Sequence, residues 1–159
     1  MTDLLEVRPI VFTAQSKHFF YCCDVVCEYV FKSGCIPLNP FRAFGYFLGD
    51  RVDRNDVRVG NNNLIRLADE LWVFGTSIAD GVLFEIEYAR DLGRNVRLFT
   101  VGNRLTDIHE VTVDHLQFEN QLIQLTRQRI GSMSLSPTEF LKATVRGEKP
   151  EQPRLFDPE

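Results

Sequence analysis

Short apolar runs alternate with longer amphipathic segments along the first two thirds of the chain. The runs are rich in β-branched and aromatic residues, which is typical of buried strands. They are RPIVFTA (8–14), CIPLNP (35–40), ELWVFG (70–75) and NVRLFT (95–100). The segments between them have the length of helices, over residues 16–33, 53–68 and 80–92. Strands that are joined through helices in this way pair in parallel.

The last third of the chain has a weaker strand signal and a strong helix signal. Residues 110–119 (EVTVDHLQFE) form either a further strand or a loop, whereas residues 120–130 have a helical pattern. The sequence SPTE, which begins at Ser136, combines an N-cap serine, a proline at the first helical position and the glutamate of a capping box. It predicts a helix over residues 136–145.

These elements predict a single α/β domain over residues 1–147, in which helices cover both faces of a mostly parallel sheet to give three layers. The aromatic segment 41–50 (FRAFGYFLGD) has neither a helical nor a strand period, so it forms a loop or a short helix. Residues 148–159 are polar and rich in proline, which predicts a flexible C-terminal tail.

Composition and charge narrow the classes of function. The net charge of −4 and the pI near 5.4 argue against a nucleic-acid-binding face, which usually shows clustered positive charge. The sequence contains no run of about 18 apolar residues, and its N-terminus lacks the basic start and apolar stretch of a signal peptide. We therefore expect a cytoplasmic protein without a membrane or nucleic-acid partner.

Cys22, Cys23, Cys27 and Cys35 fall within 14 residues of one another. Their spacing lacks the paired pattern of most structural metal sites, although His18 lies on the same predicted helix and leaves a Cys/His site as an alternative. Free cysteine packs as a small hydrophobic residue, so we predict reduced, largely buried thiols. We expect neither a metal nor an organic cofactor.

Glu85 stands on the apolar side of the helix over residues 80–92. An advance of about 100° per residue places Glu85 within the apolar arc, whereas Glu87 lies outside it. Burying an unpaired carboxylate costs several kcal/mol, so Glu85 needs either a partner, such as Arg66, or an opening to a ligand. Ligands of parallel sheets bind beyond the carboxyl ends of the strands, where the loop 75–79 lies.

The segment 67–99 (LADELWVFGTSIADGVLFEIEYARDLGRNVRLF) resembles the core of the nucleoside 2-deoxyribosyltransferase and nucleotide N-glycosidase superfamily. That family has an Ala-Asp pair before a strand, a short polar loop with an acidic residue and a glycine, and an E-I-x-Y-A motif on a helix. The matching residues here are Ala68-Asp69, Val73, Asp80-Gly81 and Glu85-Ile86-Glu87-Tyr88-Ala89. The resemblance covers about residues 9–99 and implies a flavodoxin-like fold.

The resemblance also implies cleavage or transfer of the N-glycosidic bond of a nucleoside, a nucleotide or a related metabolite such as a dinucleotide. Glu85 would be the nucleophile that forms a covalent glycosyl intermediate, and Asp80 would protonate the leaving base. Asn61 stands where the transferases carry another aspartate. This departure favours the alternative of a nucleotide-binding or sensing domain without catalysis. A redox or dinucleotide-binding domain is less favoured, because no G-x-G-x-x-G follows the first strand.

Several polar residues at the same edge of the sheet are candidate substrate ligands. Lys17, Ser77 and the first-turn amides of the helix, around Gly81, form a predicted 5′-phosphate site, with Gln15 and Ser16 beside it. The alternative is that these are separate surface residues.

Asn39 follows the second strand and is either a ligand of the base or ribose or a turn residue before Pro40. Phe41, Phe44 and Tyr46 are candidates to stack on a base, with core packing or an oligomer interface as the alternative.

Two kinds of macromolecular partner follow from the sequence. Relatives of this type are commonly homo-oligomers, so we expect self-association. The tail sequence QPRLF has the spacing of peptides that dock on the bacterial sliding clamp, through Gln152, Leu155 and Phe156, although so short a match also arises by chance.

Overall fold

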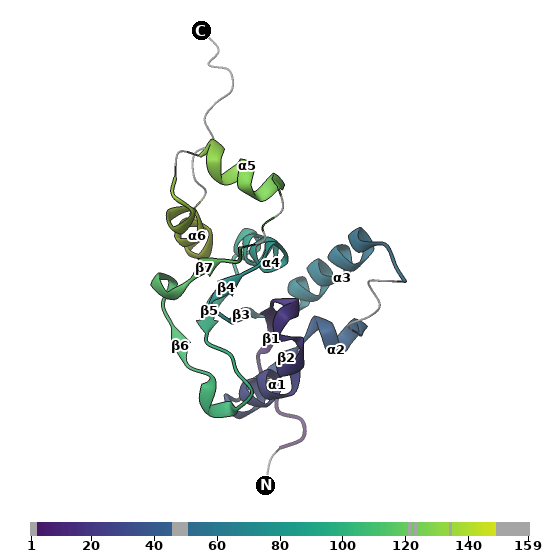
Figure 1. Ribbon diagram of the computed structural model, residues 1–159. Coiled ribbons are helices and arrows are strands. Elements are labelled where there is room, and N and C mark those ends of the chain that lie inside the picture. Colours follow the sequence, from purple (N-terminus) through teal and green to yellow (C-terminus); the bar gives the residue numbers. More distant parts are fainter. Residues whose placement is uncertain (1–2, 46–50, 121, 123, 134, 149–159) are drawn as a thin grey trace.

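The computed structural model describes residues 3–45, 51–120, 122, 124–133 and 135–148 (Figure 1). A five-stranded sheet in the order β2-β1-β3-β5-β6 forms its centre. The strands are β1 (Ile10–Gln15), β2 (Ile36–Leu38), β3 (Glu70–Phe74), β5 (Asn95–Phe99) and β6 (Glu110–Val111). The first four pair in parallel and β6 pairs antiparallel with β5, which confirms the predicted mostly parallel sheet. The order of the parallel strands is that of flavodoxin-like domains.

A second, two-stranded sheet ties the loop after β3 to the last third of the chain. It consists of β4 (Ser77–Ile78) and β7 (Gln117–Phe118), which pair in parallel. Only β7 lies in a segment with a strand signal, because β4 is too short to show a period. This pairing brings residues 117–119 to the carboxyl edge of the main sheet.

Helices cover both faces of the main sheet, which confirms the predicted three layers. One face carries α1 (Cys23–Lys32), and the other carries α3 (Arg54–Leu67), α4 (Asp80–Asp91) and α6 (Pro137–Arg146). Successive residues of β1 divide between the two cores: Val11 packs in the cluster that contains Val26 of α1, and Phe12 packs in the cluster that contains Ile86 of α4. This alternation is the side-chain period of a strand that is buried on both faces.

The helix predicted over residues 16–33 is two elements rather than one. A 3-10 helix, η1 (Lys17–Cys22), precedes α1, and Phe19 departs from helical geometry with φ −110° and ψ 18°. Ser16 caps η1 through its side chain, which accepts from the backbone N–H of His18. A local serine cap therefore starts a separate short helix, and this turns Lys17 and His18 towards the edge of the sheet.

The other helix boundaries follow the capping signals in the sequence. The Asp53 side chain caps α3 by accepting from the N–H of Asn55, and Ser136 and Glu139 form the predicted capping box of α6. The other helices within the described residues are α2 (Pro40–Phe44), η3 (Leu105–Asp107), η4 (Val113–His115) and α5 (Gln124–Ser132).

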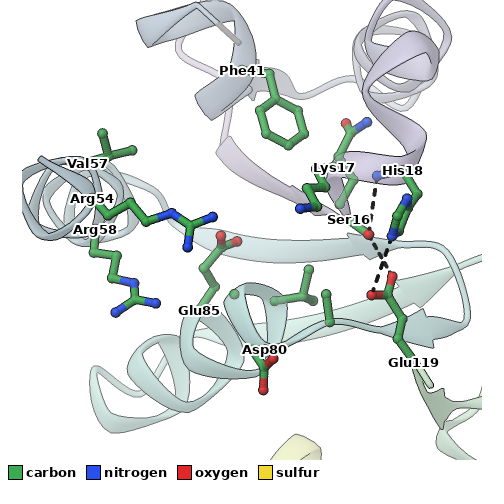
Figure 2. A pocket seen from close by; sticks show the side chains of 14 residues that line it. Ser16, Lys17, His18, Phe41, Arg54, Val57, Arg58, Asp80, Glu85 and Glu119 are labelled. Atoms are coloured by element: carbon green, nitrogen blue, oxygen red, sulfur yellow. Dashed lines mark hydrogen bonds and ion pairs between the residues drawn. The ribbon is translucent and has the colours of Figure 1, made fainter. Parts of the chain in front are cut away.

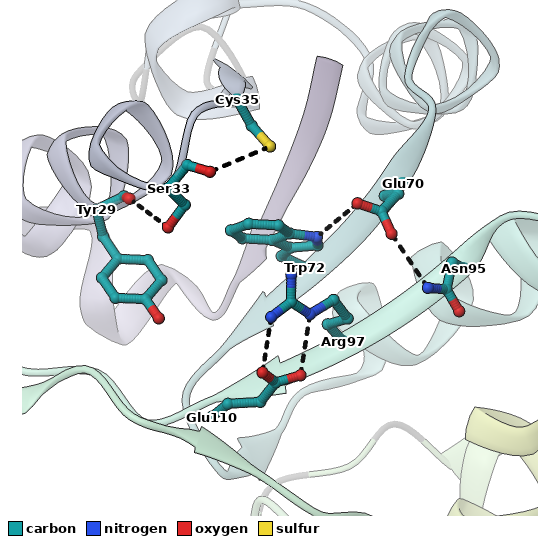
Figure 3. A network of polar contacts seen from close by, with 8 residues as sticks. All are labelled: Tyr29, Ser33, Cys35, Glu70, Trp72, Asn95, Arg97 and Glu110. Atoms are coloured by element: carbon teal, nitrogen blue, oxygen red, sulfur yellow. Dashed lines mark hydrogen bonds and ion pairs between the residues drawn. The ribbon is translucent and has the colours of Figure 1, made fainter. Parts of the chain in front are cut away.

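Arg97 covers Trp72 on the α1 face of the sheet (Figure 3). The Arg97 guanidinium carbon lies 4.6 Å from the centre of the indole ring, and its Nε and Nη2 donate to the two carboxylate oxygens of Glu110 at 2.9 and 2.7 Å. Trp72 Nε1 donates to Glu70, which also accepts from Asn95. This network covers the part of the aromatic core that contains Trp72 and Phe99 on the α1 face of the sheet.

The four cysteines are free thiols, of which three are buried and Cys27 is half-buried. Burial raises the pKa of the Cys27 thiol to about 11, so it is a poor nucleophile at neutral pH. None of the helices in the described part of the chain has the length and hydropathy needed to cross a bilayer. The predicted clamp-binding residues Gln152, Leu155 and Phe156 lie outside the described residues, as does Tyr46.

Candidate active site

A cavity of about 470 Å³ opens beyond the carboxyl ends of β1 and β3 (Figure 2). Five parts of the chain form its walls: the start of η1, Phe41 of α2, the first turns of α3, the N-terminus of α4 and Glu119. The predicted site residues that line it are Gln15, Ser16, Lys17, Phe41, Asp80, Gly81 and Glu85. This is the edge at which ligands of open parallel sheets bind.

Glu85 lies in the wall of this cavity, and one of its carboxylate oxygens is buried. The residue as a whole is half-buried, but its Oε2 is fully buried and no described group forms a hydrogen bond with it. Glu85 forms no ion pair within the described residues, and the proposed alternative partner Arg66 is exposed to solvent. Burial raises the pKa of Glu85 from an ordinary value of 4.5 to about 8. The carboxyl group is therefore mostly protonated at neutral pH in the unliganded protein.

The N-terminus of α4 faces the same cavity. Ala79 is the N-cap and contributes no capping side chain, so the N–H groups of the first turn have no side-chain acceptor from the cap. Gly81 leaves the backbone accessible, because a Cβ added there would meet no heavy atom within 4 Å. With the exposed ammonium of Lys17 nearby, this end of the cavity suits an anion.

Asp80 lines the cavity but is held by another element. The buried hydroxyl of Thr126, in α5, donates to Asp80 Oδ1 at 2.6 Å. Figure 2 shows the Asp80 carboxyl group pointing away from Glu85. The predicted role of Asp80 as the acid for the leaving base therefore has no geometric support in the unliganded structure.

Gln15 and Asn39 form a buried polar pair behind the cavity. Asn39 Nδ2 donates to Gln15 Oε1 at 3.0 Å, and Gln15 Nε2 donates to the carbonyl of Phe19 at 2.6 Å. The Asn39 side chain also caps α2 by accepting from the N–H of Arg42. Asn39 does not line the cavity. Its hydrogen bonds connect β1 to α2 and fix the orientation of the Gln15 amide.

Ser16, His18 and Glu119 form the opposite wall. Ser16 Oγ donates to Glu119 Oε1 at 2.7 Å, and His18 Nε2 lies 4.0 Å from Glu119 Oε2. Beyond them is a second cavity of about 480 Å³, which shares His18 and Glu119. Ser77 lines that second cavity and not the one with Lys17, because its strand pairs with β7 and turns it outward. The predicted grouping of Lys17 with Ser77 is thus divided between two cavities.

Two other predicted ligands lie outside the cavity wall. The ring of Phe44 packs against α3, where its Cζ lies 3.0 Å from the position of a Cβ on Gly60. Asn61 is half-buried on α3, and its buried Oδ1 forms no hydrogen bond with any described group. Phe41, in contrast, lines the cavity beside Gln15.

Four polar residues that line the cavity were not predicted as substrate ligands from the sequence: His18, Arg54, Arg58 and Glu119. Arg54 and Arg58 are four residues apart on the helix that Asp53 caps, so they lie on one face of that helix. This spacing could have been used to predict a positively charged helix face from the sequence. Glu119 carried no such signal, because only the β4–β7 pairing brings it to the cavity.

A comparison with protein families places most of these features in one segment. Residues 13–99 match the family described as a domain of unknown function (DUF7768). The chain belongs to this family. The DUF7768 segment begins within β1 and contains α3, β3 and α4, and therefore Glu85, Arg54 and Arg58, whereas Glu119 lies beyond it. No curated protein matches the chain.

Proposed function

We propose that the protein cleaves or transfers the N-glycosidic bond of a nucleoside, a nucleotide or a related metabolite, with Glu85 as the nucleophile. The observation that carries this proposal is the fully buried, unpartnered Oε2 of Glu85 in the wall of an open cavity. An orphaned carboxyl oxygen destabilises the folded state, and a ligand that meets it is a physical reason for its position. The motif resemblance around Glu85 supports the same chemistry.

In the proposed reaction, a bond forms between a Glu85 oxygen and the anomeric carbon as the bond from that carbon to the base nitrogen breaks. The electron pair of the broken bond leaves with the base. Water or a second base then attacks the same carbon and releases the sugar from Glu85. Both steps pass through states with positive charge on the sugar, which a carboxylate in a water-poor site stabilises strongly.

The reactive form of Glu85 is the ionised carboxylate. Because burial raises the pKa of Glu85 to about 8, this form is a minority at neutral pH before a ligand binds. Positive charge stabilises the carboxylate, and the cavity has Lys17 on one side and Arg54 and Arg58 on the other. Positive charge that develops on the sugar acts in the same direction.

A 5′-phosphate on the substrate fits the N-terminus of α4. The amides of the first turn point to where an anion binds, Gly81 lets it approach the backbone, and Lys17 adds a charge. Ser77 is not part of this site. A phosphate held there would place the sugar beside Glu85, which lies one turn further along α4.

The test is release of free base, followed by chromatography on a panel of nucleosides, nucleotides and dinucleotides. Glu85→Gln should abolish release while circular dichroism stays unchanged. Glu87→Gln is the matched control, because Glu87 lies two residues further on the same helix and pairs with Arg129 outside the cavity. Full turnover by the Glu85→Gln protein, or loss of turnover in both variants, would refute the proposed role of Glu85.

A second candidate function is nucleotide binding without catalysis. The observation that favours it is the engagement of Asp80 by Thr126, together with the position of Asn61 outside the cavity. Thermal stabilisation of the protein by a nucleotide, without any base released over a long incubation, would favour this second function.

A further inference from the structure

Arg54 and Arg58 present two positive charges to the cavity without a carboxylate partner among the described residues. Four other arginines in the described residues each pair with a carboxylate, in the pairs Arg8–Glu6, Arg42–Asp24, Arg97–Glu110 and Arg129–Glu87. Exposed arginines such as Arg66 and Arg146 form no such pair among the described residues, so what distinguishes Arg54 and Arg58 is their place in the cavity wall. Like charges one turn apart on a helix repel each other. Both residues are exposed, and the Arg58 guanidinium carbon also lies 5.8 Å from the centre of the Phe84 ring. Because the two side chains line the cavity, a ligand that fills it meets their N–H donors.

The position of the arginines relative to Glu85 indicates which part of a nucleotide they meet. Figure 2 shows Arg54 and Arg58 on one side of Glu85, and Lys17 and His18 on the other. A nucleotide has the order phosphate, sugar and base. With its phosphate at the N-terminus of α4 and its anomeric carbon at Glu85, the base extends towards α3.

We propose that Arg54 and Arg58 select a nucleobase that presents carbonyl oxygens, such as uracil or hypoxanthine, over one that presents an amino group at the same position. This inference rests on the proposed function, because it takes the orientation of the substrate from the position of Glu85. A guanidinium group has five N–H donors and no acceptor, so it satisfies carbonyl oxygens and leaves an amino group without a partner. An amino group that faces these donors gives up hydrogen bonds to water without gaining an acceptor, which is a basis for discrimination.

The same contacts assist departure of the base. When the bond between the anomeric carbon and the base nitrogen breaks, the electron pair passes to the base and spreads onto its carbonyl oxygens. Donors from Arg54 and Arg58 stabilise that negative charge, and Glu85, which has lost its proton on substrate binding, forms the new bond to carbon. The departing base anion then takes its proton from water. This route needs no carboxylic acid at the base, which agrees with the engagement of Asp80 by Thr126.

The experiment measures binding in the Glu85→Gln background, so that no turnover interferes. Isothermal titration calorimetry compares UMP with CMP and IMP with AMP, each in the ribose and deoxyribose forms. The members of each pair carry the same phosphate and differ at one oxo or amino group and at the ring nitrogen next to it, which carries a hydrogen only in the oxo member. We expect the oxo member to bind more tightly by on the order of 10- to 100-fold, the usual effect of a charge-assisted hydrogen bond.

Substitution of each arginine by methionine removes the charge and the N–H donors and keeps an unbranched, flexible side chain. Arg54→Met and Arg58→Met should each reduce the oxo preference, and the double variant should abolish it. Arg66→Met is the matched control, because Arg66 is an exposed arginine of α3 that does not line the cavity, and it should retain the preference. Should a methionine variant not fold, Arg→Lys at the same positions keeps the charge without the planar fork and should also weaken the preference.

The outcomes separate this inference from the proposed function. An oxo preference that depends on the two arginines supports the inference even if the wild-type protein releases no base. Equal binding of the oxo and amino members, a preference that survives the double substitution, or no binding of any of these nucleotides would overturn it. Release of free base with equal rates from both members of each pair would overturn the inference and leave the role of Glu85 intact.

Discussion

Ser16 Oγ donates a 2.7 Å hydrogen bond to Oε1 of Glu119, across 103 positions of the sequence. Ser16 directly follows β1 and is the N-cap of η1, whereas Glu119 directly follows β7. The contact therefore fastens the last third of the chain to the candidate site. It also keeps the Glu119 side chain, which is 16% exposed, in the wall that separates the two cavities.

Removal of this hydrogen bond should loosen that wall. We expect Ser16→Ala to lower the free energy of unfolding by roughly 1–2 kcal/mol, because it removes both the cap of η1 and the donor to Glu119. Nucleotide binding should weaken together with stability. Glu119→Gln keeps an oxygen acceptor for Ser16 and should behave more like the wild type than Glu119→Ala does. Urea unfolding and thermal shift with nucleotide measure the two effects.

The pH dependence of base release reports the protonation state of Glu85. A nucleophilic carboxylate with a pKa near 8 should give a kcat/KM that rises about tenfold per pH unit below pH 8 and levels off above it. A carboxyl group that acted as an acid would give the opposite slope. A rate that falls from pH 6 to pH 8 would therefore exclude the nucleophilic role.

The free energy of unfolding should also depend on pH because of the raised pKa of Glu85. Below the ordinary pKa of 4.5 the group is protonated in both states, so it has no effect. Between pH 4.5 and about 8 the unfolded chain releases this proton and the folded protein retains it, so the folded state loses stability as the pH rises. The loss reaches at most roughly 4–5 kcal/mol by pH 8.

Glu85→Gln removes this titration, because an amide does not ionise. The variant should therefore gain stability relative to the wild type as the pH rises from 5 to 8. Urea unfolding of both proteins at several pH values measures the difference, and the other titrating groups cancel in the comparison. A constant difference across this range would mean that Glu85 titrates normally.

Gly81→Ala separates folding from ligand approach. Alanine is the better helix former, and its Cβ would meet no protein atom, so stability should rise by roughly 0.5–1 kcal/mol. Phosphate binding at the N-terminus of α4 should weaken, because the methyl group projects into the space where an anion approaches the backbone. Equal affinity of the variant and the wild type for a nucleoside 5′-phosphate would place the phosphate elsewhere.

Most of the fold could be predicted from the sequence because its signals are local. The buried strands are short apolar runs, and the caps at Asp53 and Ser136 fix where α3 and α6 begin. The inward position of Glu85 followed from helical period alone. The break between η1 and α1 could not be predicted in this way, because Cys22 and Cys23 continue the apolar pattern across it.

The candidate site was less predictable because it depends on contacts between distant segments. Asn39 and Gln15 satisfy each other in the interior, which a sequence cannot show when each stands at a strand end. Glu119 reaches the cavity only through the pairing of β4 with β7, and each of these strands has two residues. Hydrogen bonds of this kind follow from the completed fold rather than from local propensity.

The buried carboxylate oxygen of Glu85 couples ligand binding to the release of a proton. A resting protein that holds a proton on Glu85 at neutral pH must release it when a ligand requires the ionised form. The measured heat of association will then vary linearly with the ionisation enthalpy of the buffer. The slope of that line gives the number of protons released per ligand bound.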